Sequence, residues 1–310
     1  MAWVIGQHGL LGSALVRALP AEAAVYRVPF RYHWGDPPAL HEQLVRAVAG
    51  FALAVQGADD WTVHWAAGLG TMQSAAGAIT TETAALHLVL SQLEAHRAFQ
   101  LRPGRLTFAS SAGAIYAGSR DFLISEKSDP APTTEYAIAK LRQEKLVSEF
   151  SRHHPNVAVL AARFSTLYGG GQAAGKAQGL LSHLSRQVIR GLPMRIYVPL
   201  DTIRDYLEIN DAARAMIAAC EQVSTGSLLT KIIASERPTT ISEIIAVFRK
   251  VASRPPRIIT SMTSASELYG RRIQFRSSLR PDLRPEYRTS LLVGIAKLLE
   301  AERMRYATAT

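Results

Sequence analysis

A tyrosine and a lysine lie four residues apart in the segment Tyr136-Ala137-Ile138-Ala139-Lys140. Side chains with this spacing lie on one face of a helix, about one turn apart. A positive charge at ~4 Å in an effective dielectric of ~20 is worth about 4 kcal/mol, which lowers a phenol pKa by about three units from ~10. The spacing therefore predicts that Tyr136 is a general acid-base of near-neutral pKa with Lys140 beside it.

Three glycines near the start of the chain have the spacing of a phosphate-binding loop. They follow the apolar run Ala2–Ile5 and precede residues with helical periodicity, which places them at a strand-to-helix turn. Glycines there allow positive φ and close backbone approach, and the helix N-terminus offers free amides to a pyrophosphate. The pattern predicts a dinucleotide site, the alternative being a merely tight turn. The residues expected at the phosphates are Gly6, His8, Gly9, Leu10 and Gly12.

The end of the second apolar stretch indicates which dinucleotide binds. A carboxylate about 20 residues after the loop is typical of an NAD site, where it binds the ribose hydroxyls. No acidic residue lies between Glu22 and Asp36, and Arg27 and Arg31 lie there instead. Guanidinium groups pair well with a 2′-phosphate, so the spacing favours NADP, with NAD as the alternative. The competing interpretation is that both arginines are ordinary surface residues.

Apolar segments of alternating periodicity position these residues. Strands are expected at residues 2–5, 23–30, 62–67, 106–110 and 157–162. Helices are expected at residues 10–19, 40–48, 80–97, 136–153, 179–190, 211–222 and 289–305. This alternation predicts an α/β fold with a doubly wound parallel sheet. We expect a dinucleotide-binding domain over residues 1–165, to which residues from about 200–225 return, and a smaller, interleaved substrate-binding cap over residues 166–310.

The composition excludes several classes of protein. With 48% hydrophobic and 19% charged residues, the 310-residue chain can bury a substantial core. Its single cysteine, Cys220, allows no internal disulfide or thiolate zinc cage, so we expect no metal site and a cytoplasmic location. The formal charge of +10 is dispersed rather than arranged in blocks, so nucleic acid is not an expected partner. No apolar run reaches about 18 residues, so no membrane partner is expected either.

An ordered set of motifs resembles the extended short-chain dehydrogenase/reductases, in their nucleotide-sugar epimerase/dehydratase branch. In chain order the motifs are Gly6-x-x-Gly9-x-x-Gly12, Trp65-Ala66-Ala67-Gly68, Ser110-Ser111 before Ile115-Tyr116, Tyr136-x-x-x-Lys140, and Arg204-Asp205-Tyr206 with Asp211. The resemblance implies a Rossmann-type fold, with Ala66 and Ala67 at the cofactor. It also implies that Tyr136 is the catalytic acid-base, that Lys140 holds the nicotinamide ribose, and that Ser111 bonds to the reacting oxygen.

The chain departs from the family pattern at several positions. The family places its serine or threonine where this chain has Ala112 and Ala114, so Ser111 is the nearest substitute. Where the family often has asparagine ahead of a tyrosine-glycine pair, this chain has Thr166 two residues before Tyr168. The substrate-binding residues that the resemblance implies are Thr166, Arg204, Arg271 and Arg272, the last two as clamps for a diphosphate. For the arginines, surface or interdomain ion pairs are the alternative.

The resemblance implies hydride transfer at a sugar carbon of a nucleotide sugar. The segment Ala112-Gly113-Ala114 cannot give a proton to a leaving hydroxyl, so dehydration is disfavoured. The stretch Tyr136 to Lys140 and the loop Gly6 to Gly12 also resemble GDP-fucose synthase, but Cys220 lies in another element and no matching histidine lies near Gly179, so double epimerisation is not expected. A 4-epimerase and a 4-ketoreductase with exchangeable NADPH remain, besides a non-catalytic NADP(H)-binding regulator. The resemblance further implies a homodimer formed by helices near residues 80–97 and 136–153.

Overall fold

The centre of the molecule is a parallel sheet, which the chain enters one strand in from one edge; it then adds that edge strand and afterwards builds strand by strand to the opposite edge. The computed structural model describes residues 1–68, 76–171, 179–261, 272–279 and 288–309. Over these residues the main sheet has six strands in the order β2-β1-β3-β4-β5-β9. The strands are β1 (Ala2–Ile5), β2 (Val25–Tyr26), β3 (Trp61–Trp65), β4 (Gly104–Ser111), β5 (Val157–Phe164) and β9 (Leu228–Ile233). All neighbouring pairs are parallel.

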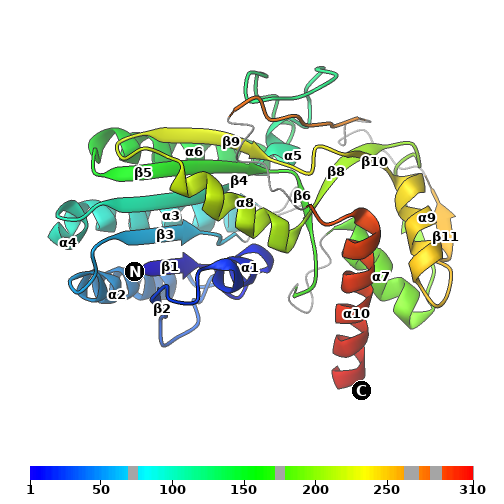
Figure 1. Ribbon diagram of the computed structural model, residues 1–310, viewed down its shortest axis with the longest axis horizontal. Coiled ribbons are helices and arrows are strands. Elements are labelled where there is room, and N and C mark those ends of the chain that lie inside the picture. Colours follow the sequence, from blue (N-terminus) through cyan, green and yellow to red (C-terminus); the bar gives the residue numbers. More distant parts are fainter. Residues whose placement is uncertain (69–75, 172–178, 262–271, 280–287, 310) are drawn as a thin grey trace.

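Helices cover both faces of this sheet, as Figure 1 shows. Helices α1 (Leu10–Ala18) and α8 (Ile209–Glu221) pack together on one face, and α2 (Pro37–Val55), α3 (Ala76–Ala95) and α6 (Glu135–His153) pack on the other. Two short helices, α4 (Arg97–Gln100) and α5 (Ala112–Ile115), flank β4. The predicted doubly wound α/β fold of Rossmann type is therefore confirmed.

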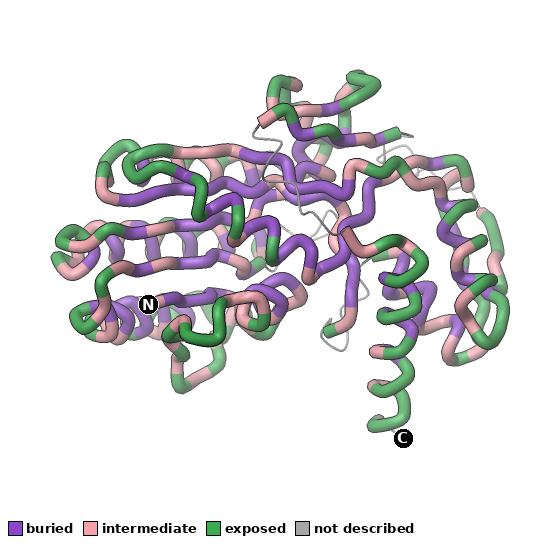
Figure 2. The backbone as a smooth tube through the Cα atoms, viewed as in Figure 1, coloured by how far each residue is buried: buried purple, intermediate pink, exposed green. Residues whose placement is uncertain are grey.

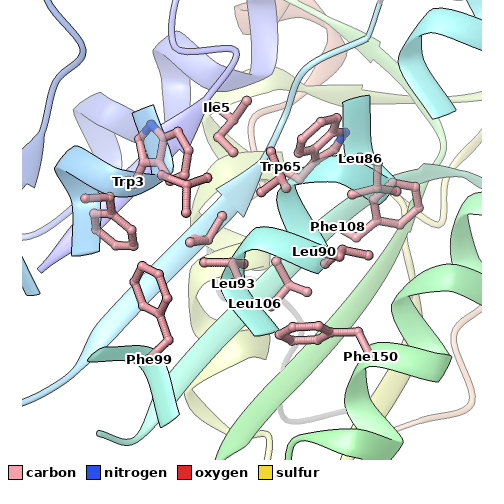
Figure 3. Close-up of a cluster of buried hydrophobic side chains, with 14 of the residues drawn as sticks. Trp3, Ile5, Trp65, Leu86, Leu90, Leu93, Phe99, Leu106, Phe108 and Phe150 are labelled. Carbon is pink, nitrogen blue, oxygen red and sulfur yellow. The ribbon is translucent and has the colours of Figure 1, made fainter. Parts of the chain in front are cut away.

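The buried faces of the strands determine which helices they bind. Trp3 and Ile5 point into the cluster formed with α2, α3 and α6, whereas Val4 points to α1 and α8, because successive side chains of a strand alternate. Figure 3 shows the first cluster, in which Phe108 and Phe150 join the sheet to α3 and α6. Its buried aromatic and aliphatic side chains fix α6 against the end of β4.

A smaller part of the chain lies beyond the carboxyl ends of the main strands (Figure 1). Its sheets join β6 (Thr166–Tyr168), β8 (Ile203–Glu208) and β10 (Pro238–Thr240), and separately β7 (Met194–Ile196) and β11 (Ile258–Thr260). Its helices are α7 (Leu180–Arg190), α9 (Ile241–Val251) and α10 (Leu291–Ala309). They share their own core, which includes Leu184, Phe248 and Leu298. In Figure 2 the strands between the two parts are buried, and the outer turns of α10 are exposed.

Several elements differ from the sequence prediction. The second apolar stretch, residues 23–30, pairs with the sheet only at Val25–Tyr26. The return to the sheet consists of α8 and of β9, which lies just after residues 200–225. Helix α9 was not predicted, although its capping box of Thr240 and Glu243 is a recognisable start signal. The division at residues 165 and 166 stays a prediction. No helix in the described ranges is both long and apolar enough to cross a bilayer.

Candidate active site

A cavity of about 810 Å³ opens at the carboxyl ends of β1, β3 and β4, where parallel α/β sheets bind their ligands. It extends from the glycine loop to the start of α6 and onward to β6 and β8 of the smaller part. The volume lies at the upper end of the range for ligand pockets of about 300–1,000 Å³. A cavity that spans both parts of the chain can hold two ligands side by side.

The glycine loop forms one end of this cavity. Gly6 has φ +92°, which a residue with a side chain rarely adopts. A Cβ at Gly12 would lie 2.0 Å from the Gly6 carbonyl oxygen, and a Cβ at Gly6 would lie 2.7 Å from the backbone of Ala66. Helix α1 starts after Gly9, which has no side chain to cap its first amides. The backbone cradle and the uncapped helix start fit the pyrophosphate of a dinucleotide.

The residues predicted to contact the phosphates lie around this cradle. Gly12 lies beneath the loop, against Gly6, while the others are on the cavity wall. The wall residues among them are Gly6, His8, Gly9, Leu10, Ala66 and Ala67. The sequence prediction therefore placed the loop and the end of β3 side by side correctly, and their role as cofactor ligands stays a prediction.

An aromatic wall continues from the end of β2. It consists of alternate residues of one extended segment, whose side chains face the cavity together: Tyr26, Val28, Phe30, Tyr32 and Trp34. The buried Tyr32 hydroxyl has no hydrogen-bond partner among the described residues, and burial raises the pKa of Tyr32 above its ordinary value. The sequence analysis missed this wall, although the alternation of ring-bearing residues was visible in it.

The two arginines of this segment lie in different environments. Arg31 lines the cavity, whereas Arg27 is exposed and does not. A third arginine, Arg46 of α2, lies with its guanidinium 4.6 Å from the centre of the Phe30 ring. Among the described residues of the cavity wall the one acid is Asp205, which accepts a hydrogen bond from the Ser235 amide at 2.8 Å. Arg31 is thus a better candidate than Arg27 for a 2′-phosphate ligand.

Tyr136 and Lys140 line the cavity together at the start of α6. Thr134 begins this helix by accepting a hydrogen bond from the Ala137 amide at 3.2 Å, so the tyrosine lies in the first turn. The Lys140 Nζ atom is 5.7 Å from the centroid of the Tyr136 ring. Ser111, at the end of β4, also lines the cavity and lies close enough to Tyr136 to act on the pKa of its phenol. The chain therefore brings the predicted catalytic residues together.

The predicted acidification of Tyr136 is wrong for this structure. Burial raises the pKa of Tyr136 above 10, and the charge of Glu82 acts in the same direction, against the lowering by Lys140 and Ser111. Burial is the largest cause, and Glu82 offsets part of the lysine's effect because Lys140 Nζ donates to Glu82 Oε1 at 2.8 Å and to Gln143 Oε1 at 3.0 Å. Although burial acts to lower it, the Glu82 charge raises the pKa of Lys140. Lys140 is therefore an ammonium paired with Glu82, and this carboxylate weakens the effect of the ammonium on the pKa of Tyr136.

The two neighbouring serines have different partners. Ser111 accepts a hydrogen bond from the Ala114 amide at 3.3 Å and so caps the short helix α5. Ser110 instead donates to Glu144 Oε1 at 2.6 Å. Glu144 is also held by Arg163 of β5, whose Nη2 lies 2.6 Å from Oε2. Both serines line the cavity, but Ser110 is engaged by the Glu144–Arg163 pair that joins α6 to the sheet, whereas Ser111 is the better candidate to contact the reacting group, a role that stays a prediction.

The predicted substrate residues separate into two sets. Thr166 and Arg204 line the cavity on the side of the smaller part. Arg204 donates to the Ile203 carbonyl at 2.7 Å. Arg272 lies outside the cavity wall, exposed, with its guanidinium 3.6 Å from the centre of the Phe122 ring, so the structure does not support it as a diphosphate clamp. Arg271 lies outside the described residues.

The described residues hold no group of three or more side chains arranged to bind a metal ion. Cys220 is buried, and burial raises the pKa of its thiol to about 12. It lies in the core between α8 and the sheet, away from the cavity, which agrees with its exclusion from the chemistry.

The sequence of this chain matches known proteins along most of its length. The profile described as "NAD dependent epimerase/dehydratase family" matches residues 2–230. The chain is 26% identical over 263 residues to a dTDP-L-rhamnose 4-epimerase of Burkholderia thailandensis, with 69% of this chain and 71% of that one covered. It is 28% identical over 117 residues to the dTDP-4-dehydro-6-deoxyglucose reductase of Escherichia coli, with 38% of this chain and only 36% of the reductase covered.

Solved structures share the whole fold. The RMD protein of Pseudomonas aeruginosa, complexed with NADPH, superposes with a TM-score of 0.77 at 21% identity and covers 98% of this chain and 99% of its own. At this identity the likeness concerns the fold. The profile match covers well over half of the chain, and the motifs it spans include the glycine loop and the Tyr136–Lys140 pair. The chain therefore belongs to the NAD-dependent epimerase/dehydratase family, an enzyme family of the extended short-chain dehydrogenase/reductase type.

Proposed function

We propose that this enzyme uses NADPH to reduce a keto group at C4 of a nucleotide sugar. The observation that carries the proposal is the joint position of Tyr136, Lys140 and Ser111 on one wall of a cavity that also contains the glycine loop. The match to a dTDP-4-keto-sugar reductase supports the direction of the reaction. The match to a 4-epimerase supports the same sugar position, with epimerisation as the second candidate.

Each residue of the site has a separate role in the proposed reaction. A reduced nicotinamide, when bound, supplies the hydride for the carbonyl carbon. Tyr136 donates its proton to the carbonyl oxygen, and the Ser111 hydroxyl orients that oxygen beside the phenol. Glu82 and Gln143 hold two of the three Lys140 N–H groups, and the third, which lies on the long contact of 3.4 Å to the Ala109 carbonyl, donates to the ribose next to the nicotinamide and fixes its position. Thr166 and Arg204 bind the nucleotide-diphosphate half from the other wall.

Arg31 supports NADPH rather than NADH as the reductant. It lies on the aromatic wall, and no described acid of the cavity lies near it to bind ribose hydroxyls. Charge-assisted hydrogen bonds to a phosphate are roughly twice as strong as neutral ones. NAD remains the alternative cofactor, with a homodimer and a cytoplasmic location as further proposals.

Absorbance at the NADPH band tests the proposal. Purified enzyme is mixed with NADPH and with 4-keto sugars carried on dTDP, UDP, GDP or CDP, and also with the corresponding 4-hydroxy sugars. We expect stoichiometric loss of NADPH with one nucleotide series of 4-keto sugars. Interconversion of 4-hydroxy epimers without net NADPH consumption would instead establish the 4-epimerase, and binding of NADPH without turnover of any sugar would contradict both.

A further inference from the structure

A buried carboxylate on α3 stands directly behind the Tyr136–Lys140 pair. Glu82 is 1% exposed, and the Lys140 Nζ atom lies 2.8 Å from its Oε1 atom. Gln143 joins the two, since it accepts from Lys140 at 3.0 Å and donates to Glu82 at 3.3 Å. The side-chain amide of Gln143 also donates to Thr83 at 3.0 Å. Helices α3 and α6 pack against each other, so this carboxylate is built into the helix pair that carries the tyrosine.

The charges around Tyr136 come from three elements. Lys140 faces it from the next turn of α6, Glu82 from α3, and the Ser111 hydroxyl from the end of β4. Glu144, one further turn along α6, is paired with Arg163 of β5. The ammonium and the carboxylate lie 2.8 Å apart and are both almost fully buried, so the carboxylate offsets part of the effect of the ammonium on the phenol.

We propose that Glu82 is a positioning residue that fixes the Lys140 ammonium beside Tyr136 and offsets part of its charge, so that in the buried site Tyr136 keeps its proton and serves as the acid for carbonyl reduction. This inference rests on the proposed function, because it assigns a direction to the reaction of the same site. In the forward step the carbonyl carbon receives a hydride from the reduced nicotinamide, which becomes oxidised. The π electrons of the C=O bond pass to oxygen, which takes the Tyr136 proton, and the phenolate then recovers a proton from water.

The protonation state of Tyr136 before the reaction explains why reduction is favoured over oxidation. Reduction needs a protonated Tyr136 as the acid, whereas oxidation of a hydroxyl needs a phenolate as the base. Burial, with Glu82 acting in the same sense, raises the pKa of Tyr136, so the protonated form dominates at neutral pH. A family member without this carboxylate would leave the full Lys140 charge acting on the phenol.

Titration of the tyrosinate absorbance tests the inference without any substrate. Subtracting the curve of Tyr136→Phe from that of the unchanged protein isolates the one phenol of interest. We expect no ionisation of Tyr136 below pH 10. In Glu82→Gln, measured against Glu82→Gln/Tyr136→Phe, the midpoint falls by about one unit or more, because one negative charge is removed. Glu82→Asp keeps the charge and restores the midpoint to within about half a unit.

The controls separate an electrostatic role from a structural one. Glu302→Gln removes another buried carboxylate, which lies 3.6 Å from Arg305 on α10, and leaves the Tyr136 titration unchanged. An unshifted midpoint in Glu82→Gln overturns the inference. If that variant does not fold, a Tyr136 midpoint near neutrality in the unchanged protein overturns it equally.

The sugar assay keeps the two proposals apart. With a 4-keto substrate in hand, Glu82→Gln should raise the rate of alcohol oxidation at pH 8 by about tenfold relative to the unchanged enzyme, as one pKa unit predicts. If Glu82→Gln still reduces the 4-keto sugar but oxidises the alcohol at the unchanged rate, the role of Glu82 is contradicted and the proposed function is not. Absence of any turnover with a shifted tyrosinate midpoint contradicts the proposed function alone.

Discussion

The ammonium of Lys140 lies 2.8 Å from the carboxylate of Glu82, in an ion pair that is almost completely buried. The same ammonium is 5.7 Å from the centre of the Tyr136 ring. The Lys140 ammonium is therefore paired with a carboxylate, and this pairing weakens its effect on the pKa of Tyr136. This arrangement makes the tyrosine a stronger candidate for a proton donor than for a base.

The rate of reduction should be insensitive to pH across the neutral range. Burial raises the pKa of Tyr136 above 10, so its protonated form is fully present at pH 7 and is lost only as the pH rises through the raised value. We expect single-turnover reduction to be constant from pH 7 to 9 and the reverse oxidation to increase with pH by up to tenfold per unit. A reductive rate that falls through a midpoint near pH 7 would contradict this.

Arg31 should determine the choice of cofactor. Removing its guanidinium in Arg31→Ala should weaken NADPH binding by about tenfold to a hundredfold, the range for a lost charge-assisted bond, and leave NADH binding unchanged. Arg27→Ala is the matched control, since Arg27 is exposed and outside the cavity wall, and its effect should be within about twofold. Isothermal titration with both cofactors measures this, and equal losses in the two variants would remove the assignment.

Gly12 should not tolerate a methyl group. In Gly12→Ala the new Cβ would lie 2.0 Å from the Gly6 carbonyl oxygen, which the backbone cannot accommodate without shifting the loop. We expect a loss of about 1–3 kcal/mol in the free energy of unfolding, together with at least tenfold weaker cofactor binding. Gly57→Ala has no atom within 4 Å of its Cβ and serves as the control. Urea denaturation that does not distinguish the two variants would contradict the close packing of the loop.

Acid should destabilise the fold partly through His64. Burial lowers the pKa of His64 to about 4 from 6.5, and its Nδ1 atom lies 2.8 Å from Thr107 Oγ1. Between these values the unfolded chain binds a proton that the folded chain does not, so stability falls as the pH drops from 6.5 to 4, by about 3 kcal/mol from this residue.

The variant His64→Asn removes the titrating ring and should flatten that part of the curve of unfolding free energy against pH. The exposed residue His153 provides the control as His153→Asn, which should keep the slope of the unchanged protein. If the unchanged protein and both variants have the same slope of unfolding free energy against pH, His64 does not contribute to the acid sensitivity.

Local pattern was sufficient to predict the first five strands of the main sheet and their parallel arrangement, but not β9. The first strand, the glycine loop and the Tyr136–Lys140 spacing are short-range signals, and the parallel topology places Ser111 beside them without further information. The contacts that the sequence could not supply are long-range ones. Glu82 lies 58 positions from Lys140, and neither its depth nor its pairing is visible in the local pattern.

Long-range contacts also explain why the sequence did not show which of the predicted arginines lie on the cavity wall. Nothing in the local pattern distinguishes Arg27 from Arg31, but of the two only Arg31 lies on the cavity wall. Arg272 was predicted as a diphosphate clamp from the bidentate chemistry of its guanidinium, and its stacking on Phe122 depends on a contact between distant segments.

The central claim is that Tyr136 gives its proton to a carbonyl beside a bound nicotinamide. The most direct test is a single-turnover reduction of a 4-keto nucleotide sugar by NADPH in Tyr136→Phe, with NADPH affinity measured in the same preparation. The account predicts unchanged NADPH affinity and a rate at least about a hundredfold lower, as expected for loss of a general acid. A rate within a few-fold of the unchanged enzyme would contradict it.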